Sequence, residues 1–329
     1  MHLSRFIPFD LSLFFTGILM SKYAPTWQLW LKNHVPQLAL IFITLIWGGT
    51  FLAVQYALNY SSPLFFVGCR FAAATLAVGL FSMHALKQIS LKDLIAGAAI
   101  GLCIAIGYAT QTIGLQSISS SESAFLTALY VPLVPILLWL LLRKTPTLMT
   151  WIGVILAFVG LMLLTGNQLG QINFNAGQRI TLFGSIAIAL EIVLIGYFST
   201  RVNLACVTVL QLAFTSIICF ACMPLNGEYQ MPAFSWPLLS ITLGLGLASA
   251  LIQMVMNWAQ RSVDPAQAAI IYAGEPVWAG IFGRIAGERL PASALLGGLL
   301  VVLAVIISQL KPKRFKQKRT QNAGQELDN

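Results

Sequence analysis

The sequence predicts an all-α membrane protein with ten transmembrane helices, arranged as two inverted five-helix repeats. Three observations predict it: an apolar composition, a series of ten apolar runs, and basic residues gathered in alternate breaks between those runs. The chain is 58% hydrophobic and 9% charged, with a mean hydropathy of +0.82. Soluble domains carry about 25% charged residues. The composition therefore excludes a soluble globular protein.

Each apolar run is close to the ~20 residues that a helix needs to cross a bilayer. The breaks carry turn residues such as Asn226-Gly227 and Asp264-Pro265, and they are too short for a soluble domain. The predicted spans are, in order, Gln37–Leu58, Pro63–Phe81, Leu94–Leu115, Ala124–Leu142, Met149–Thr165, Ile180–Ser199, Val202–Met223, Trp236–Ala259, Ala266–Ile285 and Ala292–Leu310.

The basic residues predict the orientation of the chain. If the N-terminus is inside, fifteen of the nineteen Lys and Arg residues fall in inside segments and three fall outside. The remaining one, Arg70, lies within a span. Positive charge gathers on the cytoplasmic side of membrane proteins, so we expect an inner-membrane protein with both termini in the cytoplasm. The charges form no single groove, so the net charge of +9 does not indicate a nucleic-acid partner.

The two halves resemble each other. Gly114-Leu-Gln-Ser117-Ile is answered by Ala259-Gln-Arg-Ser262-Val, 145 residues later. Five spans in a half is an odd number, so the second half must be inverted, which is a common architecture of secondary transporters. The predicted organisation is an interfacial or disordered extension (1–36), a first repeat (37–165), a connecting loop (166–179), a second repeat (180–310) and a basic cytoplasmic tail (311–329).

The extension contains a short apolar run, Phe6–Met20. The charge count does not exclude it as an eleventh span, because only the first few residues would change sides.

Three charged residues lie within the apolar runs: Arg70, Glu191 and Glu275. A charge in hydrocarbon costs at least ~2.5–3.5 kcal/mol and tends to face a water-filled cavity or a partner. We interpret the three as candidates for binding substrate or a coupling proton. The alternatives are structural: Arg70 pairs with Glu191, and Glu275 bonds the backbone groups that Pro276 leaves free.

Aromatic and amide side chains within the spans are further candidates for lining a central site. Buried amides are costly unless they bond across helices or face water, so interhelical bonding is the alternative for each of them. The candidates are Trp47, Tyr108, Gln111, Tyr130, Tyr197, Gln211, Gln253, Asn257 and Tyr272.

Prolines predict where helices break. Pro132 and Pro135 lie in the fourth span and Pro276 lies in the ninth, which is its counterpart in the second half. Interrupted helices in corresponding positions of two repeats point to a central binding site. The pairs Gly97 and Gly101, and Gly283 and Gly287, have the G-x-x-x-G spacing of closely packed helices.

Four stretches resemble the EamA-type family of the drug/metabolite transporter superfamily. They are Ile46-Trp47-Gly48-Gly49-Thr50-Phe51, Pro63 followed by Arg70, Gly274-Glu275-Pro276-Val277-Trp278-Ala279 and Gly287-Glu288-Arg289-Leu290. The first half departs from the pattern, with Arg143-Lys144 where the family often has a glutamate. The resemblance implies ten helices, alternating access and transport of small metabolites, often amino acids and frequently outward.

The sequence thus predicts a secondary transporter of amino acids or related compounds that acts by export, with protons as candidate coupling ions. Its expected partners are a small-molecule substrate and the bilayer. It has no nucleotide-binding P-loop, no H-E-x-x-H and no G-x-S-x-G motif, so we expect neither an enzyme nor a cofactor or metal. A lipid-modifying enzyme or flippase is the alternative; a membrane sensor or scaffold would need a larger soluble domain.

Overall fold

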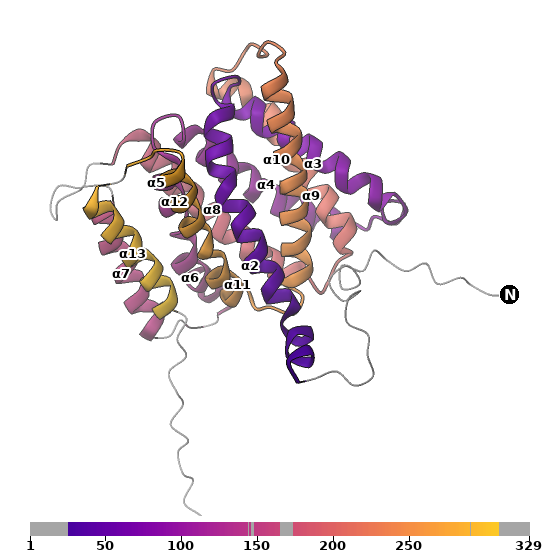
Figure 1. Cartoon of the computed structure of the whole chain (residues 1–329). Coiled ribbons are helices and arrows are strands. Elements are labelled where there is room, and N and C mark those ends of the chain that lie inside the picture. The colour runs from indigo at the N-terminus through magenta and orange to yellow at the C-terminus, as the bar shows by residue number, and fades with distance from the viewer. Residues whose placement is uncertain (1–25, 144, 146–147, 165–173, 290, 309–329) are drawn as a thin grey trace, which may run out of the picture.

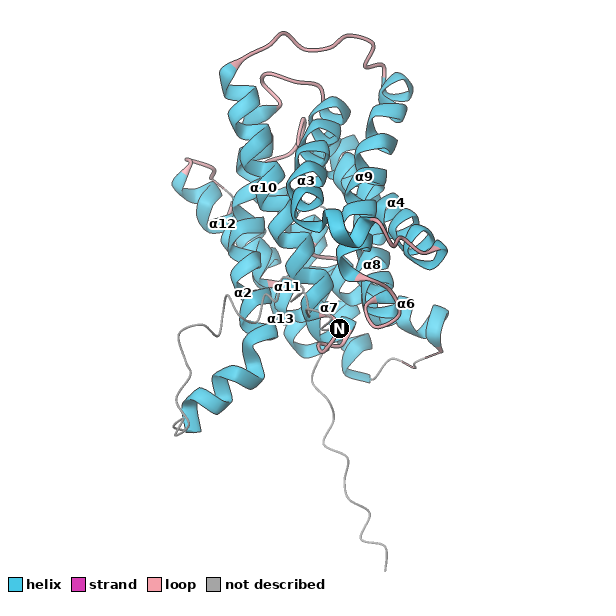
Figure 2. Cartoon of the chain, turned by 90° about the vertical axis from the view of Figure 1, so that its right-hand side faces the viewer, coloured by secondary structure: helices cyan, strands magenta, loops and turns pink. Residues whose placement is uncertain are grey.

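The computed structural model describes residues 26–143, 145, 148–164, 174–289 and 291–308. These residues form helices joined by short loops, without a strand (Figure 2). The α-helices are α2 (Thr26–Ala57), α3 (Pro63–Leu86), α4 (Leu91–Gly114), α5 (Ser120–Thr127), α6 (Tyr130–Leu142), α7 (Leu148–Leu164), α8 (Ala176–Phe198), α9 (Leu204–Cys222), α10 (Trp236–Ala259), α11 (Pro265–Tyr272), α12 (Gly274–Ile285) and α13 (Ala292–Ser308). The predicted C-terminal tail and the run Phe6–Met20 lie outside the described residues.

Seven helical stretches are long and apolar enough to cross a membrane. They are His34–Ala57, Pro63–Leu86, Leu91–Gly114, Ser120–Leu142, Ala176–Phe198, Leu204–Asn226 and Trp236–Ala259. The chain is therefore a multi-pass membrane protein. The shorter helices α7 and α13 have 17 residues each and pack chiefly against one another, to one side of the other helices (Figure 1).

The first and sixth predicted spans begin earlier in the structure. Helix α2 starts at Thr26, so residues 26–36 are helical and run directly into the first span. Helix α8 starts at Ala176 because Asn175 and Gln178 form a capping box, in which each side chain bonds the other's backbone N–H. Residues 176–179 of the predicted connecting loop therefore belong to α8.

The fourth and ninth predicted spans are each broken into two helices. Helix α5 ends and α6 begins around Ala128 and Leu129, and α11 and α12 meet at Ala273. Each break comes three residues before a proline, Pro132 or Pro276, because proline has no N–H to offer the carbonyl four residues back and its ring crowds that carbonyl. Pro135 lies inside α6.

Glycines let neighbouring helices approach closely. A side chain on Gly97 would lie 2.5 Å from the Leu210 Cβ, and one on Gly101 would lie 2.6 Å from the Gln211 carbonyl oxygen. This pair therefore sits where α4 packs against α9, as its spacing predicts. The second pair is different, because Gly287 lies beyond α12 with a φ of 94°. Gly287 therefore lies in a turn whose positive φ favours glycine, and not in a contact between helices.

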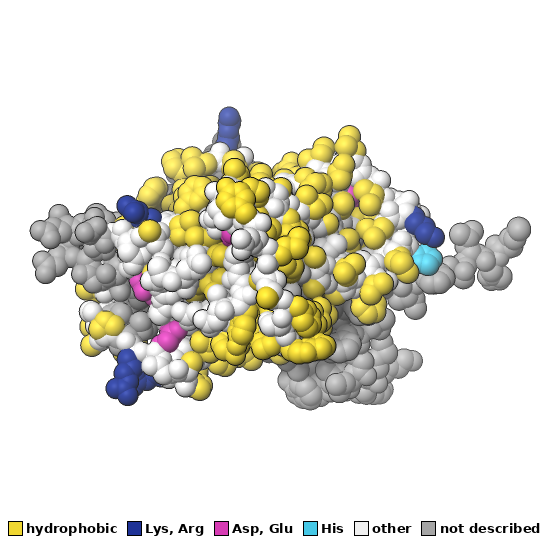
Figure 3. Space-filling view, turned by 90° about the horizontal axis from the view of Figure 1, so that it is seen from above, with side chains coloured by type: hydrophobic (Ala, Val, Ile, Leu, Met, Phe, Trp, Pro, Cys, Tyr) yellow, Lys and Arg dark blue, Asp and Glu magenta, His cyan; other side chains and the backbone are white. Residues whose placement is uncertain are grey.

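Apolar side chains cover much of the outside of the bundle. Leu76, Leu80 and Phe81 of α3 are examples, with exposed fractions of 67–78%. On the face seen in Figure 3, basic side chains are few and stand apart among apolar ones. An apolar exterior of this kind suits a lipid environment rather than water.

Candidate functional site

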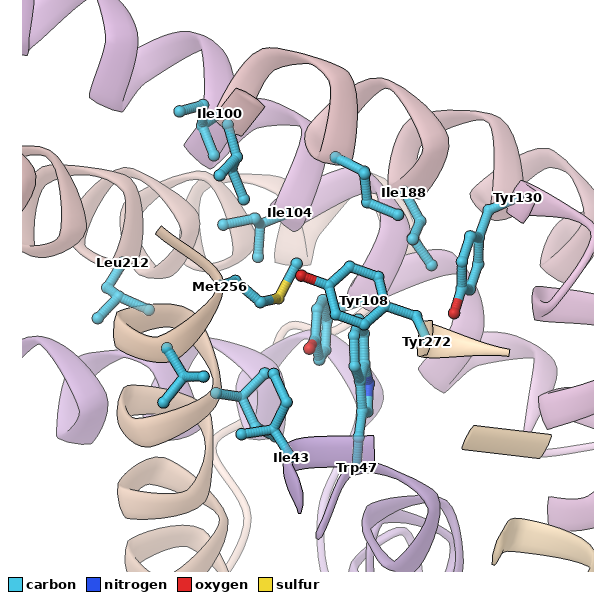
Figure 4. Close-up of a cluster of buried hydrophobic side chains, with 14 of the residues drawn as sticks. Ile43, Trp47, Ile100, Ile104, Tyr108, Tyr130, Ile188, Leu212, Met256 and Tyr272 are labelled. Atoms are coloured by element: carbon cyan, nitrogen blue, oxygen red, sulfur yellow. The ribbon is translucent and has the colours of Figure 1, made fainter. Parts of the chain in front are cut away.

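Aromatic side chains from different helices meet in the interior of the bundle, among them Trp47, Tyr108 and Tyr272 (Figure 4). Trp47 of α2 stacks in parallel with Tyr108 of α4, with ring centroids 6.5 Å apart, and Tyr272 of α11 meets Trp47 edge-on at 5.9 Å. Phe71 of α3 packs edge-on against Tyr108 at 4.9 Å. Each of these rings is at most 2% exposed.

Gly48 brings the second half of the chain next to Trp47. A side chain at Gly48 would lie 2.6 Å from the Trp278 Cβ and 2.7 Å from the Glu275 carbonyl oxygen. Only a residue without a side chain lets α12 come this close to α2. The glycine after Trp47 therefore helps to place Glu275 at the centre.

Arg70 is buried, and its charge is held by a hydroxyl and by aromatic rings. Its Nε donates a hydrogen bond of 2.7 Å to Ser249 Oγ of α10. Its guanidinium carbon lies 5.0 Å from the Tyr108 ring centroid and 5.7 Å from that of Phe71. Among the described residues, no carboxylate lies within ion-pair distance of it. The predicted alternative, an ion pair between Arg70 and Glu191, is therefore wrong.

Glu191 of α8 lies at the end of a chain of side-chain amides. Gln253 of α10 donates to Glu191 Oε1 at 2.8 Å, and Gln211 of α9 donates to Gln253 Oε1 at 2.7 Å. A carboxylate accepts but cannot donate, so it fixes the direction of both amides. The other carboxylate oxygen, Oε2, has no partner in the described structure.

Glu275 joins the two broken helices. It lies in the first turn of α12 and accepts a hydrogen bond of 3.2 Å from the hydroxyl of Tyr130, the first residue of α6. The two residues are 145 positions apart, which is within one residue of the spacing of the two prolines, Pro132 and Pro276. Corresponding breaks in the two halves therefore face each other. Glu275 Oε1 has no partner among the described residues.

Six buried polar atoms in this region lack hydrogen-bond partners within the described chain. They are Trp47 Nε1, Arg70 Nη2, the Tyr108 hydroxyl, Glu191 Oε2, Gln211 Oε1 and Glu275 Oε1. Leaving such an atom unsatisfied costs roughly 1–3 kcal/mol, so folded proteins retain few of them. We name the six residues the central polar cluster. A polar ligand could satisfy buried atoms of this kind.

Other predicted candidates bond across helices instead. Gln111 donates to Thr127 Oγ1 at 3.1 Å, and Asn257 donates to Thr208 Oγ1 at 3.1 Å. Tyr272 accepts from Gln260 at 3.2 Å. Tyr197 is 40% exposed at the end of α8 and packs against Arg201, so it lies apart from the cluster.

Sequence reasoning missed Ser249, which holds Arg70. A signal was available, because Ser249, Gln253 and Asn257 are spaced four residues apart and so share one face of α10. The site is shut in this structure, since Arg70, Glu191 and Glu275 are 1%, 0% and 0% exposed. Among the described residues, no three His, Cys, Asp or Glu side chains are grouped as a metal site.

Comparisons with known proteins place this chain among transporters. The sequence profile of the EamA-like transporter family matches residues 35–166 and again 176–310, once in each half. An uncharacterized transporter from Archaeoglobus fulgidus is 31% identical over 85% of this chain and 87% of its own length. The uncharacterized inner membrane transporter YedA of Escherichia coli K12 is 27% identical over 85% of this chain and 92% of its own length.

A solved crystal structure shares the fold at low identity. It has a TM-score of 0.61 and 17% sequence identity, and the alignment covers 84% of this chain and 98% of the other. At that level of identity the likeness concerns the fold alone.

Proposed function

The chain belongs to the EamA-like transporter family, and from that premise we propose that it is a secondary transporter that exports amino acids or related small metabolites by alternating access. The family is one of transporters rather than of enzymes. The central polar cluster is the proposed binding site. The observation that carries the proposal is the set of six buried polar atoms without partners in the described chain, one of which, Glu275 Oε1, lies on a broken helix.

The proposed architecture has ten spans in two inverted repeats. Helices α5 with α6, and α11 with α12, would each make one broken span, and the other eight helices would make one span each. The hydrogen bond between Tyr130 and Glu275 supports this arrangement, because it joins the broken span of one repeat to the broken span of the other. Discontinuous helices near the midplane at a repeat interface are where such transporters bind substrate.

The proposed orientation has both termini in the cytoplasm of a cell whose inner membrane holds the protein. The charge bias of the loops supports it. In that orientation an exporter takes substrate from the side of the N-terminus. Alternating access requires that the buried cluster opens to each side in turn, so the shut structure would be one state of the cycle.

Glu191 and Glu275 are the proposed proton-binding groups if transport is coupled to a proton gradient. Both carboxylates are buried, and each has one oxygen without a partner in the described chain. Facilitated diffusion would need neither residue to change its protonation. The two modes therefore differ in how they depend on the pH difference across the membrane.

The test is efflux of amino acids from proteoliposomes with and without a pH gradient. Proton coupling predicts that the gradient drives accumulation, and that Glu191→Gln or Glu275→Gln removes this dependence. Wild-type rates and an unchanged pH response in both variants would discard the coupling role. Cysteines at positions 70, 191 and 275 that stay inaccessible to aqueous reagents from both sides, in every condition, would discard alternating access.

A further inference from the structure

Two glutamates in the second half follow the same kind of turn. Glu228 comes directly after Gly227 and Glu288 directly after Gly287, and these glycines have φ values of 74° and 94°. The N–H of each glutamate donates a bond of 2.9 Å to the carbonyl five residues back. One turn ends the short 3-10 helix η1 (Met223–Asn226) and the other ends α12. Glycine suits this way of ending a helix because it has no Cβ.

Both glutamates reach a helix start in the first half of the chain. The Glu228 carboxylate accepts from the N–H groups of Leu64 and Phe65 in the first turn of α3, both at 3.0 Å. The Glu288 carboxylate accepts from the N–H groups of the first two residues of α5, at 3.0 and 3.2 Å. These N–H groups have no acceptor within their own helix, and a helix start attracts negative charge. The second half therefore holds two helix starts of the first half through charge-assisted bonds.

These two contacts lie at the same end of the bundle. Consecutive spans joined by short loops run in opposite directions, so α4 ends where α3 begins, and α5 begins shortly after α4. A third carboxylate lies at the opposite end, where α4 begins. Asp93 in the first turn of α4 accepts a bond of 2.8 Å from the N–H of Asn203, just before α9.

The two ends use the same device with the halves exchanged. Helices α3 and α9 are the second helices of the two halves, and α4 and α10 are the third. Asp93, at the start of α4, holds the start of α9, and Glu228, which precedes α10, holds the start of α3. An inverted repeat predicts this exchange, because it places equivalent groups at opposite ends.

We propose that these carboxylates are the gates of the transporter: Glu228 and Glu288 hold one end shut, and Asp93 holds the other. This inference rests on the proposed function, because a protein that opens to each side in turn needs a gate at each end. In the proposed orientation, Glu228 and Glu288 form the outer gate and Asp93 forms the cytoplasmic gate.

The shut centre of the structure agrees with two closed gates. Arg70, Glu191 and Glu275 are buried, so water can reach them only after the halves separate at one end. A bond that exists only while an end is closed favours the closed state of that end, and its loss shifts the population toward the open state. A helix cap within one half has no such effect. Ser235, for example, caps α10 from within the second half.

The test measures access to the centre from each side of the membrane. The five native cysteines are replaced by alanine, and one cysteine is placed at Ile188, which is buried in the cluster of Figure 4. The full chain is kept in right-side-out and in inside-out membrane vesicles. A maleimide that cannot cross the membrane is added, and the labelling rate of position 188 is measured in each kind of vesicle.

The variants should act on one side each. Glu228→Gln combined with Glu288→Gln keeps the shape of both side chains but removes their charges. We expect labelling from the side that these residues face to rise about tenfold, without a rise from the other side. Asp93→Asn should raise labelling from the opposite side only. The single variants Glu228→Gln and Glu288→Gln should each give a smaller rise in the same direction as the pair.

Two controls separate a gate from a general loss of stability. Ser235→Ala removes a helix cap near Glu228 that does not join the halves. It should lower the Tm and leave both labelling rates unchanged. Arg289→Gln removes an exposed charge beside Glu288 and should change neither the Tm nor the labelling.

Two results would overturn the gate assignment. One is that the double variant, folded as judged by its Tm, is labelled at the parent rate from both sides. The other is that labelling rises equally from both sides. If the double variant does not fold, the two single variants decide by the same criteria. Either result leaves the transport function standing if efflux continues. The proposed function fails differently: no compound exchanges across the membrane, and position 188 is labelled from neither side in the parent or in any variant.

Discussion

The carboxylates near the ends of the helices and those at the centre have very different surroundings. Asp93, Glu228 and Glu288, which we name the rim carboxylates, each accept three or four hydrogen bonds. Glu191 and Glu275 each accept one hydrogen bond, and the other oxygen of each has no partner among the described residues. The same functional group is therefore satisfied by protein at the rim and left available at the centre.

The rim carboxylates tie one half of the chain to the start of a helix in the other half. Glu228 accepts from the backbone N–H groups of Leu64 and Phe65 at the start of α3, both at 3.0 Å. Glu288 accepts from the N–H and hydroxyl groups of Ser120 and Ser121 at the start of α5. Asp93 accepts from the N–H of Asn203, just before α9, at 2.8 Å.

Helix starts have N–H groups without helical partners, and a negative charge there is favourable. The rim carboxylates therefore stabilise the packing of the two halves. The central carboxylates do the opposite, because burial without full hydrogen bonding costs free energy. We therefore expect substitutions of the rim carboxylates to lower stability, and substitutions of the central carboxylates to slow transport.

The largest effect should come from neutralising a central carboxylate. Glu275→Gln removes a charge from the proposed site but keeps an oxygen that can accept from Tyr130. We expect efflux to slow by at least about tenfold, which is the worth of roughly one charged hydrogen bond, while the Tm stays the same or rises. Initial efflux rates and thermal melts of the same preparation measure both. A lower Tm with a normal efflux rate would contradict the expected difference between the central and the rim carboxylates.

The next effect should come from removing a rim carboxylate. Glu288→Ala leaves the N–H groups of Ser120 and Ser121 without their acceptor, which should lower stability by about 2 kcal/mol. We expect a lower Tm, with efflux below the melting range changed less than in Glu275→Gln. Equal melts of the variant and the wild type would show that the rim bonds are not stabilising.

Asp93→Asn should have a smaller effect on stability. The asparagine keeps one acceptor oxygen, which can serve either Ser90 or Asn203 but not both in the present geometry. We expect a loss of about 1 kcal/mol and a modest decrease in Tm. If Asp93→Asn lowered the Tm as much as Glu288→Ala, the charge of the rim carboxylates, rather than their number of acceptor oxygens, would explain their effect on stability.

The smallest effect should come from Arg289→Gln. This side chain follows Glu288 directly but is exposed, and surface substitutions usually change stability by less than about 0.5 kcal/mol. We expect unchanged melts and unchanged efflux. A clear loss of stability would mean that Glu288 depends on a neighbouring charge as well as on the serines.

Much of the helical layout could be predicted from local sequence. Apolar runs and turn residues indicated where the helices lie, and the structure breaks the helix before a proline in the fourth and in the ninth predicted span. The starts were less accurate: α8 begins four residues before the predicted Ile180, because the capping box of Asn175 and Gln178 sets it. Each break lies just before its proline because proline has no N–H to donate to the carbonyl four residues earlier in the chain.

The sequence also singled out three charged residues within the spans, but it did not show their hydrogen-bond partners. It selected Arg70, Glu191 and Glu275 because charge is rare in apolar runs. It offered Glu191 as the partner of Arg70, whereas the structure has Ser249, because the partner depends on how α3, α8 and α10 pack.

By itself, then, the sequence determined what kind of protein this is: a helical chain with an apolar exterior, two similar halves and a few polar groups inside. Hydrophobicity, proline and helix caps act over short stretches, so they can be recognised in one dimension. The tertiary structure alone decided which buried polar atoms have hydrogen-bond partners and which have none in the described structure. Hydrogen bonding depends on distance and direction between side chains far apart in the chain, and only the packed bundle sets those.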